Sequence, residues 1–273
     1  MTDSAYKLLM VDVDGTLFGK DGTILAEDRE ALARVSGSGI KVSLSTGRAV
    51  QSCARVLDEL ALDGYHIFCD GALVYSPDSQ REVYAQPLDK DVLKRVVDFT
   101  RRQGMHIDIY SATRYFVERE TWSAAAHRNF FGIPPTITNF DEICEREVII
   151  KAGLAATSPE EVARAQRFNL EFGDCLYFSW VTSPSYPDVD FINIVAPGVS
   201  KGKGLAALSA HLGITLAETI AIGDGDNDIS LLSSAGLAVA MGNATYGAKE
   251  VADYVTLDVE HGGVAAALKE LVL

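Results

Sequence analysis

The sequence predicts an α/β protein built on a parallel sheet that helices cover on both faces, with a second, α+β domain inserted into it. Near both ends of the chain, short and almost continuously apolar strands alternate with helical segments, which is typical of a buried parallel sheet. In the middle, strands alternate polar and apolar residues, as in an antiparallel sheet with one face in water. The length of 273 residues agrees with two domains, at about 150 residues for each.

The first 75 residues carry the clearest alternation of strands and helices. An apolar run of strand length is followed by helical spacing that ends in the turn-rich segment 36–39, and the same pattern then repeats. The expected strands are Tyr6–Val13, Ile40–Ser45 and Tyr65–Cys69, and the expected helices are Glu27–Val35 and Arg48–Leu62.

The last 80 residues show the same alternation. Further core strands are expected at Asp190–Val195, Thr219–Gly223, Leu237–Met241 and Tyr254–Thr256. Between the two ends, the segments HIDIY, RYFVE and CLYFSW predict antiparallel strands, with helices near residues 89–103 and 159–172. We therefore assign residues 1–83 and 190–273 to the parallel-sheet core and residues 84–189 to the inserted domain.

The composition limits the kind of partner. Asp and Glu number 38 against 24 Lys and Arg, which gives a formal net charge of −14. Such a chain repels nucleic acid and anionic lipid, so we expect no nucleic-acid partner and no membrane partner. An anionic substrate needs a local positive site in this negative field, which a bound divalent cation would supply.

Cysteine usage and the N-terminus indicate the compartment. The four cysteines are scattered without a CxxC pair, which indicates free thiols in a reducing environment. The N-terminal segment lacks the basic start of a signal peptide. No apolar run approaches the ~18 residues of a membrane span. We therefore expect a cytoplasmic protein.

Two aspartates follow the first strand. Asp12 and Asp14 are two residues apart, so in extended chain they point to the same side. Two neighbouring carboxylates need a cation or a proton to coexist. Gly15 allows a sharp turn with its amide exposed. An acidic turn without function is the alternative for this motif taken alone.

Three other segments favour a functional site over an acidic turn without function. Ser45-Thr46-Gly47-Arg48 offers a hydroxyl and backbone amides to an anion, although an ordinary helix cap has the same pattern. Lys201 lies between glycines at the start of a helix, and Asp224, Asn227 and Asp228 form a second acidic cluster after a strand. Ligands of open α/β sheets bind at the carboxyl ends of the strands. Together these ends predict metal-assisted phosphoryl chemistry.

In these motifs the sequence resembles the haloacid dehalogenase-like hydrolase superfamily, in its Cof-type branch of small-molecule phosphatases. The family motifs appear in family order as Asp12-Val13-Asp14-Gly15-Thr16, as Thr46-Gly47-Arg48, as Lys201 before glycine, and as Gly223-Asp224 with Asn227-Asp228. A softer block, AMGNA, matches residues 240–244. The resemblance implies a Rossmann-like core, and it implies that the insert is an α+β cap domain that closes over the site.

The resemblance also implies roles for these residues. Asp12 would be the nucleophile that forms an aspartyl-phosphate, and Asp14 the general acid and base. Mg²⁺ would be held by Asp12, the backbone carbonyl of Asp14, Asp224 and Asp228. The substrate phosphate would be bound by Thr46, Gly47, Lys201 and Asn227, together with the backbone around Gly15.

Two positions depart from the pattern of this branch. Asp70 stands where the branch usually has Asn before Gly-Ala, and Asn193 stands where it often has Glu. An extra carboxylate at Asp70 would accept hydrogen bonds from sugar hydroxyls, or repel a second substrate anion. The alternative is an Asp that forms the same turn as Asn.

Residues 114–128 of the insert form a basic-aromatic cluster in an acidic chain. Arginine suits phosphate and carboxylate, and aromatic faces suit sugars or heterocycles. Arg48, Asp70, Arg114 and Tyr115 are therefore candidates for substrate specificity. The alternative is that the cluster is only a strand and a helix with ordinary buried and solvated faces. Its further members are Arg119, Trp122, His127 and Arg128.

The expected function is that of a Mg²⁺-dependent phosphatase acting on a small phosphorylated metabolite through an aspartyl-phosphate. A sugar phosphate is the first substrate class, with pyridoxal phosphate or flavin mononucleotide next. The alternatives are a sugar phosphomutase or phosphotransferase of the same superfamily and a non-catalytic regulator that binds a phospho-ligand. We expect a monomer or a homodimer.

Overall fold

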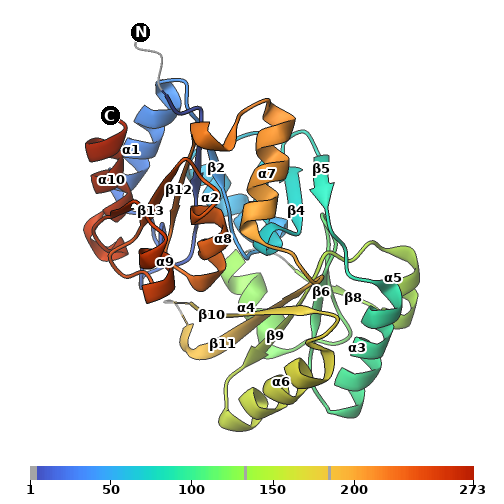
Figure 1. Cartoon of the computed structure of the whole chain (residues 1–273). Coiled ribbons are helices and arrows are strands. Elements are labelled where there is room, and N and C mark those ends of the chain that lie inside the picture. Colours follow the sequence, from blue (N-terminus) through green and yellow to red (C-terminus); the bar gives the residue numbers. More distant parts are fainter. Residues whose placement is uncertain (1–4, 132–133, 184–185) are drawn as a thin grey trace.

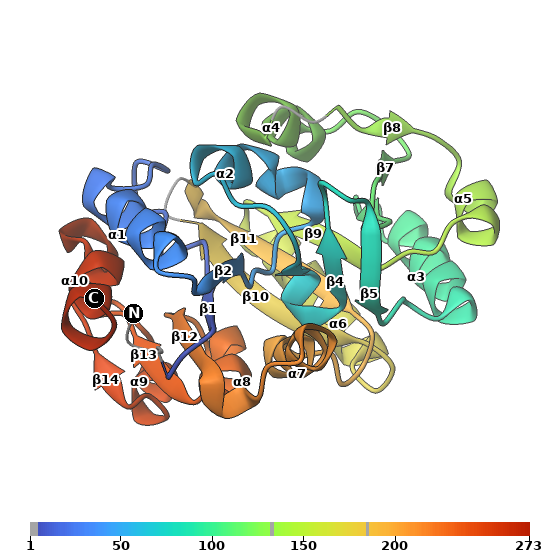
Figure 2. The same ribbon diagram turned by 90° about the horizontal axis from the view of Figure 1, so that it is seen from above.

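The computed structural model describes residues 5–131, 134–183 and 186–273. It contains a five-stranded, a six-stranded and a three-stranded sheet, and Figures 1 and 2 show how they are arranged. In the described part of the chain, no helix has both the length and the apolar character required to cross a membrane.

The five-stranded sheet is parallel and forms the core. Its order is β14-β13-β12-β1-β2. Successive connections leave the central strand β1 in opposite directions, which places a topological switch point at its carboxyl end. The strands are β1 (Leu8–Val11), β2 (Lys41–Leu44), β12 (Thr219–Gly223), β13 (Leu237–Ala240) and β14 (Tyr254–Val255).

Helices cover both faces of this sheet, as the apolar strands predict. All residues of β1 and β12 are buried. Figure 2 shows α1 (Ala26–Gly37) and α10 (Gly263–Leu271) on one face, and α7 (Lys201–Leu212) with α8 (Ile229–Leu232) on the other. The short helices α2 (Ala54–Glu59) and α9 (Tyr246–Glu250) complete this layer structure.

The expected third parallel strand begins a separate sheet instead. Segment β3 (His66–Phe68) touches the core sheet through one isolated parallel bridge between Ser45 and Ile67. It pairs antiparallel with β4 (Leu73–Ser76), which pairs with β5 (Arg81–Ala85). The prediction of a strand over 65–69 is confirmed, but its place in the core sheet is not, since a single bridge pairs it with that sheet whereas it forms a three-residue antiparallel ladder with β4.

The six-stranded sheet belongs to the inserted cap and has the order β10-β11-β9-β6-β7-β8. All neighbouring pairs are antiparallel except β7 with β8. Figure 1 shows helices α3, α5 and α6 on the side of this sheet away from the core. The helices predicted near 89–103 and 159–172 are confirmed as α3 and α6.

The bounds of the cap elements are β6 (Asp108–Tyr110), β7 (Tyr115–Val117), β8 (Thr136–Ile137), β9 (Lys151–Ala156), β10 (Tyr177–Ser183) and β11 (Tyr186–Val195) for the strands, and α3 (Lys90–Arg102), α4 (Trp122–Phe131), α5 (Phe140–Arg146) and α6 (Pro159–Phe172) for the helices.

One predicted core strand lies in the cap. Residues 190–195 form the end of β11, which pairs antiparallel with β10 and β9. The assignment of this segment to the parallel sheet is therefore wrong. Ile192, Ile194 and Val195 of β11 are buried, so the apolar run did not distinguish the two kinds of sheet. The other predicted boundary, between residues 83 and 84, falls inside β5.

The two connections between core and cap lie side by side. The side-chain amide of Gln86, at the start of the cap, donates to the backbone carbonyl of Pro197, just after its end, at 2.8 Å. The chain thus leaves and re-enters the core at neighbouring points.

Candidate active site

A buried lysine joins two of the predicted aspartates. Lys201, at the first turn of α7, places its Nζ 2.6 Å from Asp12 Oδ1 and 2.6 Å from Asp228 Oδ1. Its side chain is fully buried. A buried ammonium needs such partners. Although burial opposes the charge, Asp12 and Asp228 raise the pKa of Lys201 above its usual value.

Asp224 completes a group of three carboxylates. One oxygen from each of Asp12, Asp224 and Asp228 lies within 4.8 Å of the others. Burial, together with the charge of Asp228, raises the pKa of Asp12 well above its usual range. The same two causes raise the pKa of Asp224 to about 7. The group therefore has more negative charge than Lys201 alone neutralises.

Hydrogen bonds fix these carboxylates from behind. Asp228 Oδ2 accepts from the backbone N–H groups of Asp224 and Gly225 at 3.0 and 2.9 Å. Asp224 Oδ1 accepts from the hydroxyl of Thr16 at 3.1 Å. Partners of this kind around a group of carboxylates are expected for a cation site, because they orient the groups that hold the ion.

Asn243 belongs to the site although it is not among the predicted site residues. Its Nδ2 donates to the carbonyl of Gly15 at 2.8 Å and lies 3.4 Å from Asp224 Oδ2, while its Oδ1 accepts from Val259 N–H. Asn243 thus holds the turn after Asp14 against the Asp224 loop. The only sequence signal was the AMGNA block at residues 240–244.

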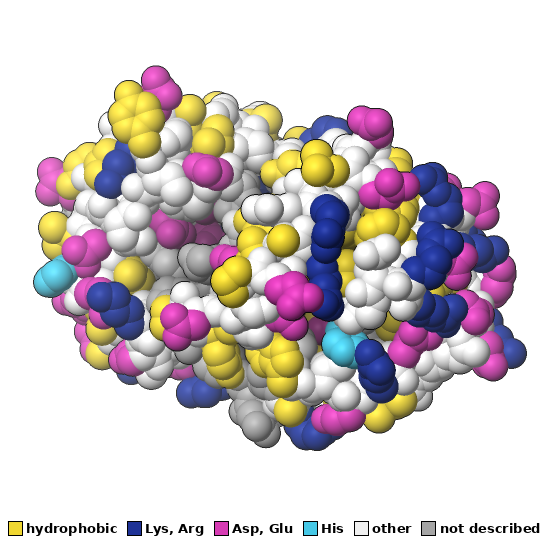
Figure 3. Space-filling model, turned by 90° about the horizontal axis from the view of Figure 1, so that it is seen from below, with side chains coloured by type: hydrophobic (Ala, Val, Ile, Leu, Met, Phe, Trp, Pro, Cys, Tyr) yellow, Lys and Arg dark blue, Asp and Glu magenta, His cyan; other side chains and the backbone are white. Residues whose placement is uncertain are grey.

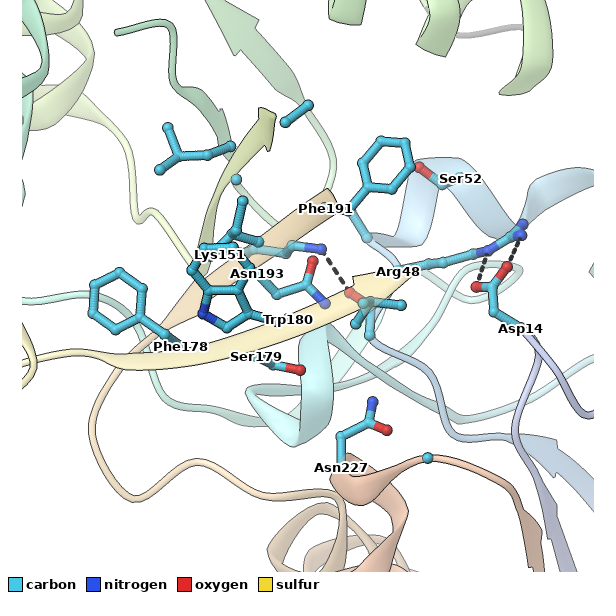
Figure 4. Close-up of a pocket in the computed structure, with 18 of the residues that line it drawn as sticks. Asp14, Arg48, Ser52, Lys151, Phe178, Ser179, Trp180, Phe191, Asn193 and Asn227 are labelled. Carbon is cyan, nitrogen blue, oxygen red and sulfur yellow. Dashed lines mark hydrogen bonds and ion pairs between the residues drawn. The ribbon is translucent and has the colours of Figure 1, made fainter. Parts of the chain in front are cut away.

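Asp14 does not join the three carboxylates through its side chain. It forms a two-point ion pair with Arg48, Nε to Oδ2 at 2.7 Å and Nη2 to Oδ1 at 2.5 Å (Figure 4). The guanidinium also lies 4.9 Å from the ring centre of Phe18. Burial acts to raise the pKa of Asp14, but Arg48 outweighs it and holds that pKa below its usual value.

The turn Thr46-Gly47-Arg48 lies beside these groups, as predicted. Thr46 is buried, and its Oγ1 accepts from Arg48 N–H at 3.1 Å. From the cap, Lys151 Nζ donates to the carbonyl of Gly47 at 2.7 Å. Lys151 begins β9 and is only 7% exposed. We did not predict it, although a single lysine in the run VIIKAGLAA is unusual for a buried strand.

The two departures from the family pattern meet in space. Asn193 Nδ2 donates to Asp70 Oδ2 at 3.0 Å. Asn227 Nδ2 donates to the other oxygen, Asp70 Oδ1, at 2.8 Å. Asp70 is 1% exposed. Its carboxylate therefore holds two amides of the protein.

A cavity of about 540 Å³ lies between these core groups and the cap sheet. From the core it is lined by Asp12, Asp14, Gly47, Arg48, Asp224 and Asn227, and from the cap by Asp108, Tyr110, Lys151, Tyr177, Phe191 and Asn193. Figure 4 shows Lys151 and Asn193 from the cap opposite Arg48 and Asn227 from the core. Figure 3 shows a hollow with acidic side chains inside it on the left of the face seen from below.

The predicted basic-aromatic cluster of the cap is not part of this lining. Arg114 is about half exposed, pairs with Glu147 and lies over Phe116. Tyr115 is buried and stacks on Tyr110, with ring centres 4.8 Å apart. Among the residues the structure describes, neither lines the cavity, so their proposal as specificity residues is not supported.

The other members of the cluster have local partners as well. Arg119 Nε lies 3.1 Å from His106 Nδ1, and Arg128 pairs with Glu120 at 2.9 Å. Trp122 is 42% exposed and borders a different, smaller pocket. The side chain of His127 lies outside the described residues. The cluster is mainly a solvated face.

Parallel strands with carboxylates, a lysine and a hydroxyl turn at their carboxyl ends, under an inserted cap, define a class of hydrolase. A family model described as haloacid dehalogenase-like hydrolase matches residues 9–268. The chain belongs to this family, and it is a hydrolase acting on phosphomonoesters.

Named relatives match along almost the whole chain. The 5-amino-6-(5-phospho-D-ribitylamino)uracil phosphatase YcsE of Bacillus subtilis is 28% identical, over 99% of this chain and 98% of the relative. Phosphatase YwpJ of the same organism is 27% identical, over 97% of this chain and 100% of the relative.

Solved structures share the fold. A haloacid dehalogenase-like hydrolase from Bacteroides thetaiotaomicron superimposes with a TM-score of 0.83 at 26% identity, covering 97% of this chain and 99% of that one. The subclass IIB sugar phosphatase BT4131 superimposes with a TM-score of 0.78 at 26% identity, covering 97% and 98%.

Proposed function

We propose that this protein is a Mg²⁺-dependent phosphatase that hydrolyses a small phosphomonoester through an aspartyl-phosphate on Asp12. The observation that carries the proposal is the group of Asp12, Asp224 and Asp228 around Lys201, of which Asp12 and Asp224 line the cavity between core and cap. Phosphoryl transfer requires mainly positioning and charge neutralisation. The carboxylates and Lys201 would supply the positioning, and a cation held by the carboxylates would complete the neutralisation.

The donor set fits magnesium. Mg²⁺ prefers a few carboxylates together with waters and substrate phosphate. The raised pKa values of Asp12 and Asp224 indicate carboxylates that are crowded without a further cation. Asp12, Asp224 and Asp228 would hold the ion, and it would neutralise charge on the transferred phosphoryl group.

Asp12 attacks phosphorus with one carboxylate oxygen, and the bond from phosphorus to the ester oxygen breaks. Lys201 holds the other oxygen of Asp12 and offers positive charge to the phosphoryl oxygens. Gly47 and Asn227 line the cavity, and together with the adjoining Thr46 they position the phosphate. Water then attacks the phosphorus of the aspartyl-phosphate, which releases inorganic phosphate and restores Asp12.

Asp14 serves as acid and base in this proposal. It gives a proton to the leaving alkoxide and later takes one from the attacking water. In the present geometry Asp14 is ion-paired with Arg48, which suits the base form. Before Asp14 acts as the acid, its ion pair with Arg48 has to break and its carboxylate has to bind a proton. Between turnovers, Arg48 keeps Asp14 in the unprotonated form.

The cap side of the cavity suits a ring-bearing leaving group. Tyr110, Tyr177 and Phe191 present aromatic side chains, and Asp108 presents a carboxylate. Aromatic faces suit sugars and heterocycles alike. A sugar phosphate remains the first candidate, in line with the sugar phosphatase among the structural relatives. Pyridoxal phosphate and flavin mononucleotide come next.

We place the reaction in the cytoplasm. The four cysteines are unpaired, which agrees with a reducing compartment.

The test is phosphate release from a broad panel of phosphomonoesters, with Mg²⁺ and with a chelator. We expect metal-dependent release that favours one sugar or cofactor phosphate. Asp12→Asn keeps the shape of the side chain, and we expect it to abolish turnover while thermal unfolding stays cooperative. Normal activity in that variant would end the aspartyl-phosphate mechanism. If the folded wild-type protein released no phosphate from any compound of the panel, a mutase or a binding role would be favoured.

A further inference from the structure

We propose that Asp70 is a positioning residue that ties the cap to the phosphate-binding groups, through hydrogen bonds to Asn193 of the cap and Asn227 of the core. This inference rests on the proposed function, because it assigns a role within the same site. Asp70 does not contact substrate in this proposal. It sets the geometry in which other residues do.

The backbone around Asp70 is strained. Cys69 and Asp70 have φ angles of 54° and 55°, and Gly71 follows with 100°. Two consecutive non-glycine residues in the left-handed region persist only where their surroundings determine them strongly. The turn is thus held in an unfavourable form by contacts on every side.

Those contacts lead to two parts of the site. Asp70 N–H donates to the carbonyl of Thr46 at 3.0 Å, and Cys69 N–H donates to the carbonyl of Arg48 at 3.0 Å. A Cβ on Gly71 would collide with the carbonyl of Ser200, at the start of the helix that carries Lys201. The strained turn is therefore wedged between the Thr46-Gly47-Arg48 turn and the beginning of α7.

The Asp70 carboxylate extends this packing. A Cβ on Gly47 would lie 2.8 Å from Asp70 Oδ1 and 2.7 Å from Asn193 Nδ2. Gly47 therefore lies directly against the hydrogen bond between Asp70 and Asn193. The oxygen nearest Gly47, Asp70 Oδ1, also accepts from the side-chain amide of Asn227 at 2.8 Å. One buried carboxylate thus touches two groups that we expect at the phosphate, Gly47 and Asn227.

Asn193 makes the arrangement a joint between domains. It lies on β11, opposite Ser179 of β10 and Gly153 of β9, and so it moves with the cap sheet. When the cap shifts, the bond to Asp70 either breaks or carries the turn with it. Because both oxygens of Asp70 are occupied by amides, a change here alters the geometry of the phosphate site and not the fit of the leaving group.

The experiment exchanges the amide and the carboxylate. Asn193→Asp places a second carboxylate against that of Asp70, and the two repel each other. We expect kcat to fall roughly tenfold or more, because displaced phosphate-binding residues position the substrate less well. Asp70→Asn in the same protein restores a donor and an acceptor across the joint. We expect the double variant to regain kcat to within about threefold of wild type. A double variant no more active than Asn193→Asp would overturn the proposal.

A second readout separates positioning from specificity. Each variant is assayed on an aryl phosphate and on a sugar phosphate that the wild type hydrolyses. We expect kcat to change for both in parallel, with their ratio of kcat/KM unchanged. A reordered preference would show that Asp70 meets the leaving group, and the proposal would be wrong.

The control is Asp188→Asn, which removes an exposed charge from the same cap strand and should leave kcat unchanged. If Asn193→Asp does not fold, Asn193→Ala removes the donor without adding charge and should still lower kcat. Thermal unfolding is measured throughout. A lower Tm in Asn193→Asp that recovers in the double variant would support the hydrogen bond between Asp70 and Asn193 even if the wild type released no phosphate. The thermal measurement therefore tests this hydrogen bond separately from the proposed phosphatase activity.

Discussion

At the scale of single residues, Gly15 shows how tightly the site is built. Its φ is 84°, and a Cβ at this position would collide with the carboxylate of Asp224. The backbone turn that follows Asp14 and the proposed metal ligand Asp224 therefore occupy adjoining space. Glycine is required here both for its conformation and for its lack of a side chain.

Gly15→Ala should raise the Mg²⁺ concentration for half-maximal activity by roughly tenfold, because the new methyl group displaces Asp224. Gly39→Ala is the matched control: Gly39 also has a positive φ, 97°, but its Cβ would meet nothing within 4 Å. Both variants should lose about 1–2 kcal/mol of stability through the left-handed backbone. Equal Mg²⁺ titrations in the two variants would contradict this account.

Asp14→Asn tests whether this carboxylate protonates the leaving group. Without an acid, esters with poor leaving groups should slow by about 10²–10⁴-fold, whereas activated aryl esters need little protonation and should slow far less. The measurement is kcat on matched alkyl and aryl phosphates, with exposed Asp63→Asn as the control. Equal slowing of both classes would remove Asp14 from the acid role.

At the scale of elements, His66 links two sheets. It lies on β3, is fully buried, and its Nδ1 accepts from Leu44 N–H of β2 at 3.1 Å. This bond requires the neutral imidazole. Burial accordingly lowers the pKa of His66 to about 4, against roughly 6.5 in an unfolded chain.

Stability should therefore depend on pH through this residue. Between pH 6.5 and about 4 the unfolded chain binds a proton that the folded one does not, so the free energy of unfolding falls as pH is lowered, by on the order of 3 kcal/mol in total. His66→Asn keeps an acceptor without a titrating ring and should flatten this dependence in urea unfolding. The exposed His261→Asn should leave the slope intact. An unchanged slope in His66→Asn would show that other groups are responsible.

The elements that the sequence predicted well are those with one dominant pattern. The strands β1 and β12 are buried on both faces, and the long helices α3 and α6 have a clear apolar period, so their positions followed from periodicity. The motif residues Asp12, Lys201, Asp224 and Asp228 could be expected together because the carboxyl ends of parallel strands share one edge.

What could not be predicted depends on the relation between domains. Lys151 and Asn193 reach the core from cap strands far away in the sequence, and no local pattern marks a side chain that crosses an interface. The pairing of Asp70 with Asn193 likewise follows from where β11 lies, and β11 itself was placed in the wrong sheet. Arg114 and Tyr115 were chosen by residue type, and their actual partners are inside the cap.

At the scale of the whole molecule, charge is the main feature. The net charge of −14 opposes the approach of a phosphate dianion, while Lys201, the positive side chain that would receive it, is fully buried. The phosphate therefore approaches against the net charge of the molecule, and the positive charge that receives it acts only at short range.

We expect kcat/KM for a dianionic ester to rise, by up to several-fold, when ionic strength increases from about 0.01 to 0.15 M at constant Mg²⁺, because the Debye length shortens from roughly 30 to 8 Å and screens the repulsion. The change should appear in KM rather than in kcat. Sucrose at matched viscosity is the control. A fall in kcat/KM with salt would show that local attraction dominates the encounter.

The hydrogen bond between Gln86 and Pro197 has a consequence for how such a molecule can change over time. The chain enters and leaves the cap at neighbouring points. A different inserted domain whose own ends lie close together could therefore be joined to the core at the same two connections. The core sheet would keep its strand order and its acidic residues, and cap contacts such as those of Lys151 and Asn193 would have to be replaced by new ones. Selectivity can thus be grafted onto this scaffold without rebuilding its chemistry.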